Sequence, residues 1–282
     1  LSEDDQIVVD TARDFARKRL APNSLQWDAQ KHFPVAEMTE AASLGMAAIY
    51  TREDVGGSGL SRIDGVRVFE ELAKGDPVTA AFLSIHNMCT WMVDTYGDDA
   101  QRQSWVPRLA SMEVIASYCL TEPGAGSDAA ALATSARREG DEYVLNGSKQ
   151  FISGGGVSGL YVVMARTGDA GARGISTFLI EKGTPGLSFG PAEAKMGWHN
   201  QPTTQVIFDD VRVPASSMLG GEAGLGIGFR IAMNGLNGGR LNIAACSLGG
   251  AQFAYDTTLA YMAQREAFGA PLIEEPTIRG TL

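Results

Sequence analysis

The chain has 282 residues, of which 44% are hydrophobic, so it is long enough to form more than one folded unit. Its formal net charge of −10 argues against a nucleic-acid partner, because affinity for a phosphate backbone comes largely from Lys and Arg. No window approaches the roughly 18 consecutive apolar residues of a membrane-spanning helix, so we also expect no membrane partner.

The first part of the sequence, residues 1–115, predicts an α-helical domain. Ser2 is placed to cap a first helix, with Asp5 in its first turn. Apolar residues at helical spacing, broken by glycine-rich segments, predict four further helices. Their expected ranges are 35–48, 63–74, 79–96 and 98–110.

Residues 116–222 predict a β-domain, because the pattern changes to short apolar runs separated by turn residues. Strands are expected at 143–145, 161–165, 175–180 and 204–208. The pair Asn146-Gly147 predicts a tight hairpin that returns segment 150–152 alongside segment 143–145, because both residues tolerate a positive φ. The domain is expected to be a β-sandwich or to resemble a barrel.

Helical periodicity resumes at about residue 226 and continues to about residue 268. Residues 223–282 are therefore expected to form the start of a C-terminal helical domain, and the fold class is α+β. A glycine-rich stretch at 224–228 follows a loop rather than a buried strand, so we reject a dinucleotide-binding interpretation.

Cysteine and histidine residues are few and scattered. The sequence holds three of each, and none has the spacing of a zinc site or of a redox dithiol. We expect buried, reduced thiols and no protein-bound metal.

Two segments carry residues suited to a flat, polar ligand. In segment 121–128, glycines let the backbone approach a ligand, while Thr121 and Ser127 offer hydroxyl groups. In segment 151–153, Phe151 offers a ring for stacking, and Ser153 is expected on the same strand face. Taken singly, segment 121–128 is more typical of a Pro-Gly turn that leaves a strand, and segment 151–153 is more typical of a strand in a hydrophobic core.

Two arginines leave a similar choice open. Arg240 follows two glycines at an expected helix start, where its guanidinium could bind a phosphate or a carbonyl oxygen. Taken alone, each of Arg240 and Arg265 is more typical of a solvated charge on a helix.

Taken together, the motifs resemble the acyl-CoA dehydrogenase family. Segments 118–128, 149–155, 208–214, 237–240 and 265–269 occur in the family's order, and the resemblance covers nearly all of residues 1–273. Segments 145–149, 181–189, 197–203 and 235–240 are most similar to members that act on a short branched thioester such as isobutyryl-CoA.

The resemblance implies a bound FAD, an acyl-CoA substrate, an electron-transfer flavoprotein as electron acceptor, and a homotetramer. The residues implied to bind FAD are Tyr118, Cys119, Leu120, Thr121, Gly126, Ser127, Phe151, Ile152 and Ser153, with Arg265 and Phe268 reaching the FAD of a neighbouring subunit. The residues implied to bind acyl-CoA are Ser127, Asn237, Gly238, Gly239 and Arg240. The implied compartment is the cytoplasm in a bacterium or the mitochondrial matrix in a eukaryote.

The sequence departs from the family's pattern after residue 273. The glutamate that serves the family as base belongs to a later segment, so we assign no catalytic residue, and neither Glu274 nor Glu275 stands in the matching motif. Pro276 stands where the family commonly has a glutamine near FAD. The expected C-terminal domain is therefore truncated, as in a shortened gene product, a fragment or an incomplete sequence.

Three functions remain open from the sequence. The first is an FAD-dependent acyl-CoA dehydrogenase that introduces an α,β double bond into a short branched-chain thioester. The second is a truncated, non-catalytic protein that binds flavin or acyl-CoA. The third is an acyl-CoA oxidase, in which oxygen replaces the protein acceptor.

Overall fold

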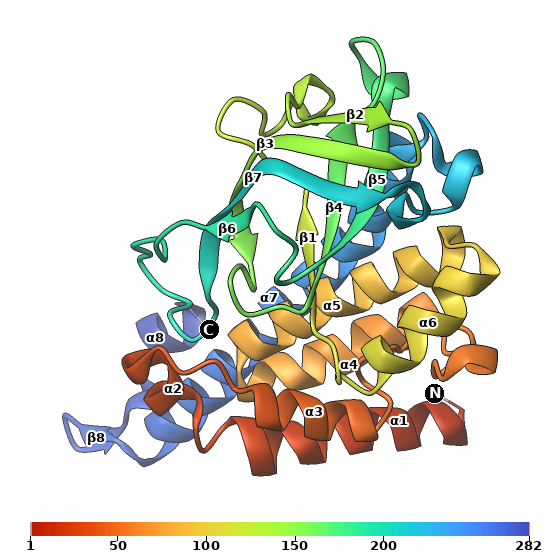
Figure 1. Cartoon of the computed structure of the whole chain (residues 1–282). Helices are drawn as coiled ribbons and strands as arrows, with labels where there is room; N and C mark the ends of the chain where they lie inside the picture. Colours follow the sequence, from red (N-terminus) through yellow and green to blue (C-terminus); the bar gives the residue numbers. More distant parts are fainter. Residues whose placement is uncertain (1, 282) are drawn as a thin grey trace.

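The computed structural model describes residues 2–281 and has an α+β fold, as expected. A layer of helices supports a seven-stranded sheet, and one long helix follows the sheet in sequence (Figure 1). The helices that precede the sheet are α1 (Glu3–Phe15), α2 (Ser24–Gln30), α3 (Val35–Ser43), α4 (Arg62–Gly75), α5 (Pro77–Tyr96) and α6 (Asp99–Ala110). Figure 1 shows the sheet on one side of this layer, with β1 and β4 nearest to α5.

Side-chain caps explain where several of these helices begin. Ser2 accepts a hydrogen bond from the Asp5 backbone amide, as predicted, and Ser61 and Asp98 cap α4 and α6 in the same way. The predicted helices at 63–74, 79–96 and 98–110 are confirmed. The helix predicted at 35–48 ends earlier, at Ser43, because Gly45 adopts a φ of 82° that cannot continue a helix.

The middle of the chain forms the sheet. Its strands are β1 (Ala116–Cys119), β2 (Ser135–Glu139), β3 (Glu142–Ser153), β4 (Leu160–Arg166), β5 (Ile175–Glu181), β6 (Leu187–Phe189) and β7 (Thr203–Pro214). The order is β1-β4-β2-β3-β7-β6, and β5 pairs with β4. β1 runs parallel to β4, whereas β3 is antiparallel to both β2 and β7. All four predicted strand segments lie within strands of this sheet.

The hairpin predicted at Asn146-Gly147 is wrong. These residues lie inside β3, and the turn that begins this strand is instead at Gly140, which has a φ of 63°. Glycine at position 147 allows the backbone near Thr134 to approach closely, because a Cβ there would stand 2.7 Å from the Cα of Thr134. The Asn146 amide group donates to Asp210 Oδ1 and accepts from the Asp210 amide, each at 2.9 Å, beside a register shift in the β3–β7 pairing.

A long helix, α7 (Gly228–Gln264), packs along α4 and α5, close to the predicted range of 226–268. Glycines allow this contact: a Cβ on Gly249 would stand 2.1 Å from the Glu70 carbonyl oxygen. Short elements follow, namely β8 (Glu266–Ala267), β9 (Ala270–Pro271) and α8 (Pro276–Thr281). Figure 1 shows β8 and α8 at the end of α7 that points away from the sheet.

A shared hydrophobic cluster joins the three parts of the chain. Val93 of α5, Leu160 and Val162 of β4, and Ile231 of α7 are all buried in it. The sequence changes from helix to strand between α6 and β1, and α7 begins after residue 227. The domain boundaries at 115 and 222 stay predictions.

Candidate functional site

The two segments predicted to hold a flat ligand lie against each other. The Gln150 amide donates to the Thr121 carbonyl oxygen at 2.8 Å, and the Ser117 hydroxyl donates to the Ser153 carbonyl oxygen at 2.6 Å. Because β1 leads directly into the Thr121 segment, these bonds fix the start of the glycine loop beside the end of β3.

Phe151 projects from the edge of this junction. Its backbone has a φ of 59°, and the register of β3 shifts between Lys149 and Ile152, so the regular alternation used in the prediction is broken here. As a result the Phe151 ring is 62% exposed, while Ile152 beside it is only 2% exposed. An aromatic ring left open to solvent beside a glycine loop is a surface on which a flat heterocycle would fit.

The glycine loop beside Phe151 is open. Gly126 and Ser127 are exposed, and a Cβ added at Gly124 or Gly126 would meet nothing within 4 Å. The space next to their backbone is therefore free for a ligand.

The residues of β1 and its end form a buried floor. Cys119 is fully buried and Leu120 is 6% exposed, so their side chains belong to the core, and only their backbone can face a ligand. Burial raises the pKa of the Cys119 thiol to about 12, which keeps it protonated near neutral pH. The three cysteines are all free and buried, as the sequence predicted.

An apolar cavity of about 390 Å³ opens where α5, β1 and α7 meet. Its walls are Ser84, Ile85, Met88, Tyr118, Leu236, Gly239, Arg240 and Ile243. Tyr118 and Arg240, which are far apart in sequence, meet here as part of one site. Ser84, Ile85 and Met88 could not be predicted from the sequence, because their only signal was the apolar face of an ordinary helix.

The expectation that Arg240 stands near a helix start is wrong. α7 begins at Gly228, so Arg240 lies inside the helix and no free N-terminal amides face a ligand there. Arg240 and Asn237 are exposed, with the guanidinium donating to Asn237 Oδ1 at 3.0 Å. Gly238 is buried against Arg62, since a Cβ on Gly238 would stand 2.3 Å from Arg62 Nη1.

Arg265 and Phe268 lie outside this site within one chain. Arg265 ends α7, and Phe268 sits in the β8–β9 hairpin with a φ of 54° and a fully exposed ring. The hairpin lies at the end of α7 that is remote from the sheet (Figure 1).

Gln201 ties a neighbouring loop to the site. Its side-chain amide donates to the Ser153 hydroxyl at 2.5 Å, and its Oε1 is buried with no partner among the described residues. The same loop is held to the helical layer by His199, whose amide and ring contact the Asp28 carboxylate at 2.7 and 2.9 Å.

The His199–Asp28 contact is expected to weaken as pH rises. The hydrogen bond to Asp28 raises the pKa of His199, so this contact stabilises the fold fully below about pH 6.5, the unperturbed His value, and is lost as pH climbs through the raised pKa. Hydrogen exchange at the His199 amide should therefore accelerate in that range by more than the base-catalysed increase common to all amides. In an Asp28→Asn variant this excess acceleration should be largely absent; an unchanged excess would contradict the assignment.

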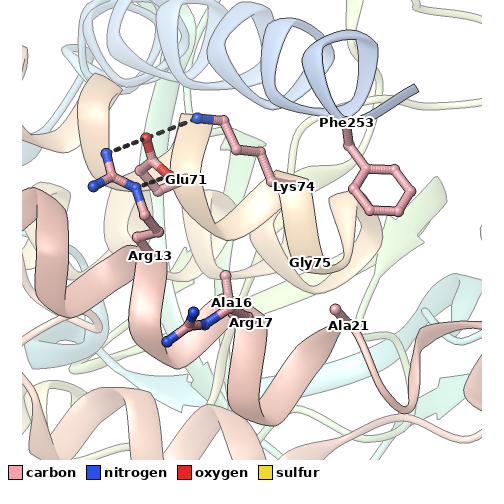
Figure 2. A pocket seen from close by; sticks show the side chains of 8 residues that line it. All are labelled: Arg13, Ala16, Arg17, Ala21, Glu71, Lys74, Gly75 and Phe253. Carbon is pink, nitrogen blue, oxygen red and sulfur yellow. Dashed lines mark hydrogen bonds and ion pairs between the residues drawn. The ribbon is translucent and has the colours of Figure 1, made fainter. Parts of the chain in front are cut away.

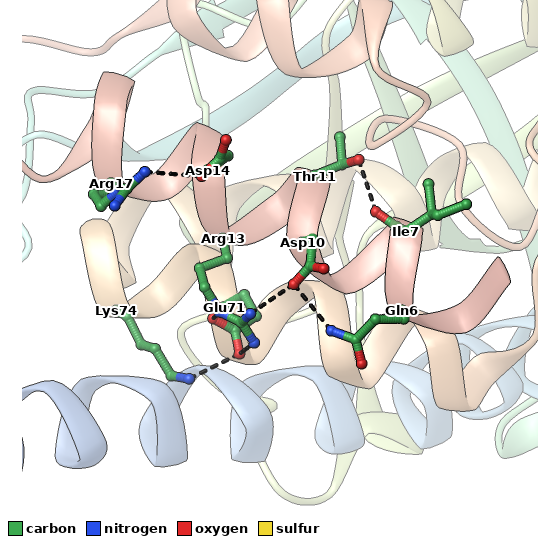
Figure 3. Close-up of polar contacts among 9 residues, drawn as sticks. All are labelled: Gln6, Ile7, Asp10, Thr11, Arg13, Asp14, Arg17, Glu71 and Lys74. Carbon is green, nitrogen blue, oxygen red and sulfur yellow. Dashed lines mark hydrogen bonds and ion pairs between the residues drawn. The ribbon is translucent and has the colours of Figure 1, made fainter. Parts of the chain in front are cut away.

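A second cavity, of about 170 Å³, lies between the α1 end, α4 and α7 (Figure 2). The basic side chains at its rim are already engaged. Glu71 accepts from Arg13 at 3.1 Å and from Lys74 at 2.8 Å, and Arg17 pairs with Asp14 (Figure 3). This network joins α1 to α4, and we assign it a structural role.

Within residues 2–281, no three His, Cys, Asp or Glu side chains gather as they would around a metal ion. In the same range, no helix combines the length and the apolar character that a membrane crossing requires.

Family models match three successive parts of the chain. The model for the acyl-CoA dehydrogenase N-terminal domain matches residues 2–113, that for the middle domain matches 117–211, and that for the C-terminal domain matches 226–282. The last match continues beyond residue 273, where the resemblance was expected to stop.

Individual proteins agree with these models. The chain is 54% identical over 273 residues to a mitochondrial isobutyryl-CoA dehydrogenase of Dictyostelium discoideum, which covers 96% of this chain and 65% of that protein. Butyryl-CoA dehydrogenase from Megasphaera elsdenii superimposes with a TM-score of 0.94 at 38% identity, over 99% of this chain and 74% of that one. The FAD complex of PigA gives a TM-score of 0.93 at 29% identity, over 99% and 73%.

Fold and site together define an α+β protein in which a helical layer, a mixed sheet and a long helix surround an apolar cavity. The chain belongs to the acyl-CoA dehydrogenase family. It spans 65% of the length of the isobutyryl-CoA dehydrogenase that it matches.

Proposed function

We propose that this protein is an FAD-dependent acyl-CoA dehydrogenase that introduces an α,β double bond into a short branched-chain thioester such as isobutyryl-CoA. The observation that carries the proposal is the junction of the Thr121 loop with the end of β3, next to the apolar cavity at Tyr118. A site for a flat ring and a site for an acyl chain therefore adjoin, as transfer of hydrogen from one to the other requires.

FAD would be held by both sides of that junction. The Leu120 and Thr121 backbone, the Ser153 hydroxyl and the exposed Phe151 ring would face the ring system, while Gly126 and Ser127 would lie along the polar remainder. Cys119 and Ile152 are buried, so their side chains would support the site from the hydrophobic core. When bound, FAD supplies the acceptor for a hydride from the substrate. Arg265 and Phe268 would reach the FAD of a second subunit in a homotetramer, as their distance from the site within one chain requires.

Acyl-CoA would enter along α7. Gly239 keeps the helix surface low at the cavity, Gly238 packs against Arg62 beneath it, and exposed Asn237 and Arg240 would meet the polar part of the ligand. The acyl group would occupy the cavity bounded by Met88 and Ile243, and Ser127 would touch the substrate from the loop side. We assign no base among residues 1–282.

A Gly239→Val substitution should weaken acyl-CoA binding about tenfold or more, because it adds methyl groups to the wall of a hydrophobic pocket. The effect can be measured from the change in flavin absorbance on titration with isobutyryl-CoA. Gly250→Val on the same helix is the matched control, since a Cβ there meets nothing within 4 Å. Equal effects of both substitutions would contradict the placement of the acyl group.

The function is tested by adding isobutyryl-CoA without oxygen to purified protein that also carries the C-terminal segment in which the family's base lies. We expect the flavin absorbance to bleach, and a flavin spectrum that persists in excess substrate would leave only a binding function. Oxygen consumption in the absence of an added acceptor would instead favour an oxidase.

We further propose that an electron-transfer flavoprotein receives the electrons, because a dehydrogenase needs an acceptor other than oxygen. Membership of the family supports this partner. For the compartment, we propose the cytoplasm in a bacterium and the mitochondrial matrix in a eukaryote; the match to a mitochondrial enzyme supports the second case.

A further inference from the structure

A buried ion pair lies directly beneath the proposed flavin site. Lys149 is completely buried, and its ammonium group lies 2.7 Å from Oε1 of Glu122, which is only 7% exposed. Lys149 also donates to the Leu120 carbonyl oxygen at 3.1 Å. Lysine and glutamate are rarely buried so fully unless they are paired.

Glu122 connects the pair to a third segment. Its carboxylate accepts hydrogen bonds from the backbone amides of Ala133 at 2.6 Å and Thr134 at 3.0 Å. The pair therefore binds together the start of the glycine loop, the approach to β2 and the middle of β3. Its members stand one residue after Thr121 and two residues before Phe151, so it reaches both proposed walls of the flavin site.

Fold stability alone is a weak reason for this arrangement. Burial opposes ionisation of Glu122, but the charge and hydrogen bonds of Lys149 lower the pKa of Glu122 overall. Burial likewise lowers the pKa of Lys149, and Glu122 opposes that effect. Because desolvating two charges offsets much of their attraction, apolar side chains of similar volume often stabilise a core equally well.

We propose that Lys149 and Glu122 are positioning residues of the flavin site: together they lock the Leu120–Glu122 backbone onto β3 and cancel each other's charge next to the flavin. This inference rests on the proposed function. A single charge left at this place would act on the flavin through a poorly screened interior, where electrostatic effects are strong.

The test compares Lys149→Met, Glu122→Gln and the double variant by FAD affinity and by flavin midpoint potential. Each substitution is expected to weaken FAD binding about tenfold, as for residues in one ion-pair network. Lys149→Met leaves a negative charge and should lower the midpoint potential, whereas Glu122→Gln leaves a positive charge and should raise it. The double variant should return the potential close to that of the wild type while its FAD affinity stays weakened.

The double variant keeps the test decisive if a single substitution prevents folding, because it leaves no unpaired charge. Arg212→Met is the control, since it breaks an exposed pair with Glu139 on the same sheet and should change neither quantity. Wild-type FAD affinity in the double variant, or potential shifts of the same sign in both single variants, would overturn the inference. A wild-type protein that binds no FAD would overturn the proposed function, and this inference with it.

Discussion

Replacing Phe82 with alanine is expected to lower the free energy of unfolding by about 3–5 kcal/mol, the usual cost of removing a buried aromatic ring. The ring is fully buried and packs edge-on against Phe33, with 4.7 Å between ring centroids. Its edge also lies 3.0 Å from where a Cβ on Gly154 would stand, directly after Ser153. The cavity left behind should therefore loosen the end of β3 as well as the helical layer, and weaken FAD binding.

Chemical denaturation and FAD titration of the same Phe82→Ala preparation measure both effects. Phe253→Ala is the control, because that ring is 51% exposed on α7 and its loss should cost much less. Similar losses in the two variants would show that burial of Phe82 does not set the effect. Normal FAD affinity in a destabilised Phe82→Ala protein would show that the packing of α5 does not influence the flavin site.

The second large effect is expected from Asp94→Asn, at about 3–5 kcal/mol of unfolding free energy, because it breaks a buried charge network. The Asp94 side chain is only 4% exposed and accepts from Arg52 and Arg102 at 3.0 Å. Arg102 is itself only 11% exposed, so the substitution leaves a poorly solvated guanidinium with Asp54 alone. α5, α6 and the segment before α4 would then lose a common contact.

The same network predicts that the stability of the fold falls at acidic pH. Burial opposes ionisation of Asp94, yet the hydrogen bonds from Arg52 and Arg102 lower its pKa overall. Its contribution to stability is therefore present above the unfolded value of about 3.9 and is lost as pH falls through the lowered value. Asp14→Asn is the surface control, where a 51% exposed carboxylate in water-screened ion pairs should contribute much less. Equal costs for the two carboxylates would contradict the argument from burial.

Local signals in the sequence predicted most of the helices and strands correctly. Ser2 acts as a cap as expected, because a capping side chain needs only residues three positions away. Asn146-Gly147 misled for the opposite reason. Its role depends on Thr134, which precedes β2, and on Asp210 of β7, and a local pattern cannot contain that information.

The residues of the candidate site likewise fall into two groups, those that sequence motifs mark and those that only tertiary contacts bring together. Its glycine loop and Phe151 were found from sequence because family motifs mark them, although the left-handed backbone at Phe151 was not foreseen. Ser84 and Met88 of the cavity were missed, since a helix face that lines a cavity has the same composition as one that fills a core. The pairing of Lys149 with Glu122 required knowledge of tertiary contacts.

The cluster that contains Leu160, Val162 and Ile231 has a practical consequence for anyone dividing this protein into pieces. Excised alone, the central sheet would present Leu160 and Val162 to water and tend to aggregate. The three segments that match family models are therefore not expected to fold independently. Thermal unfolding of the whole chain should show one cooperative transition.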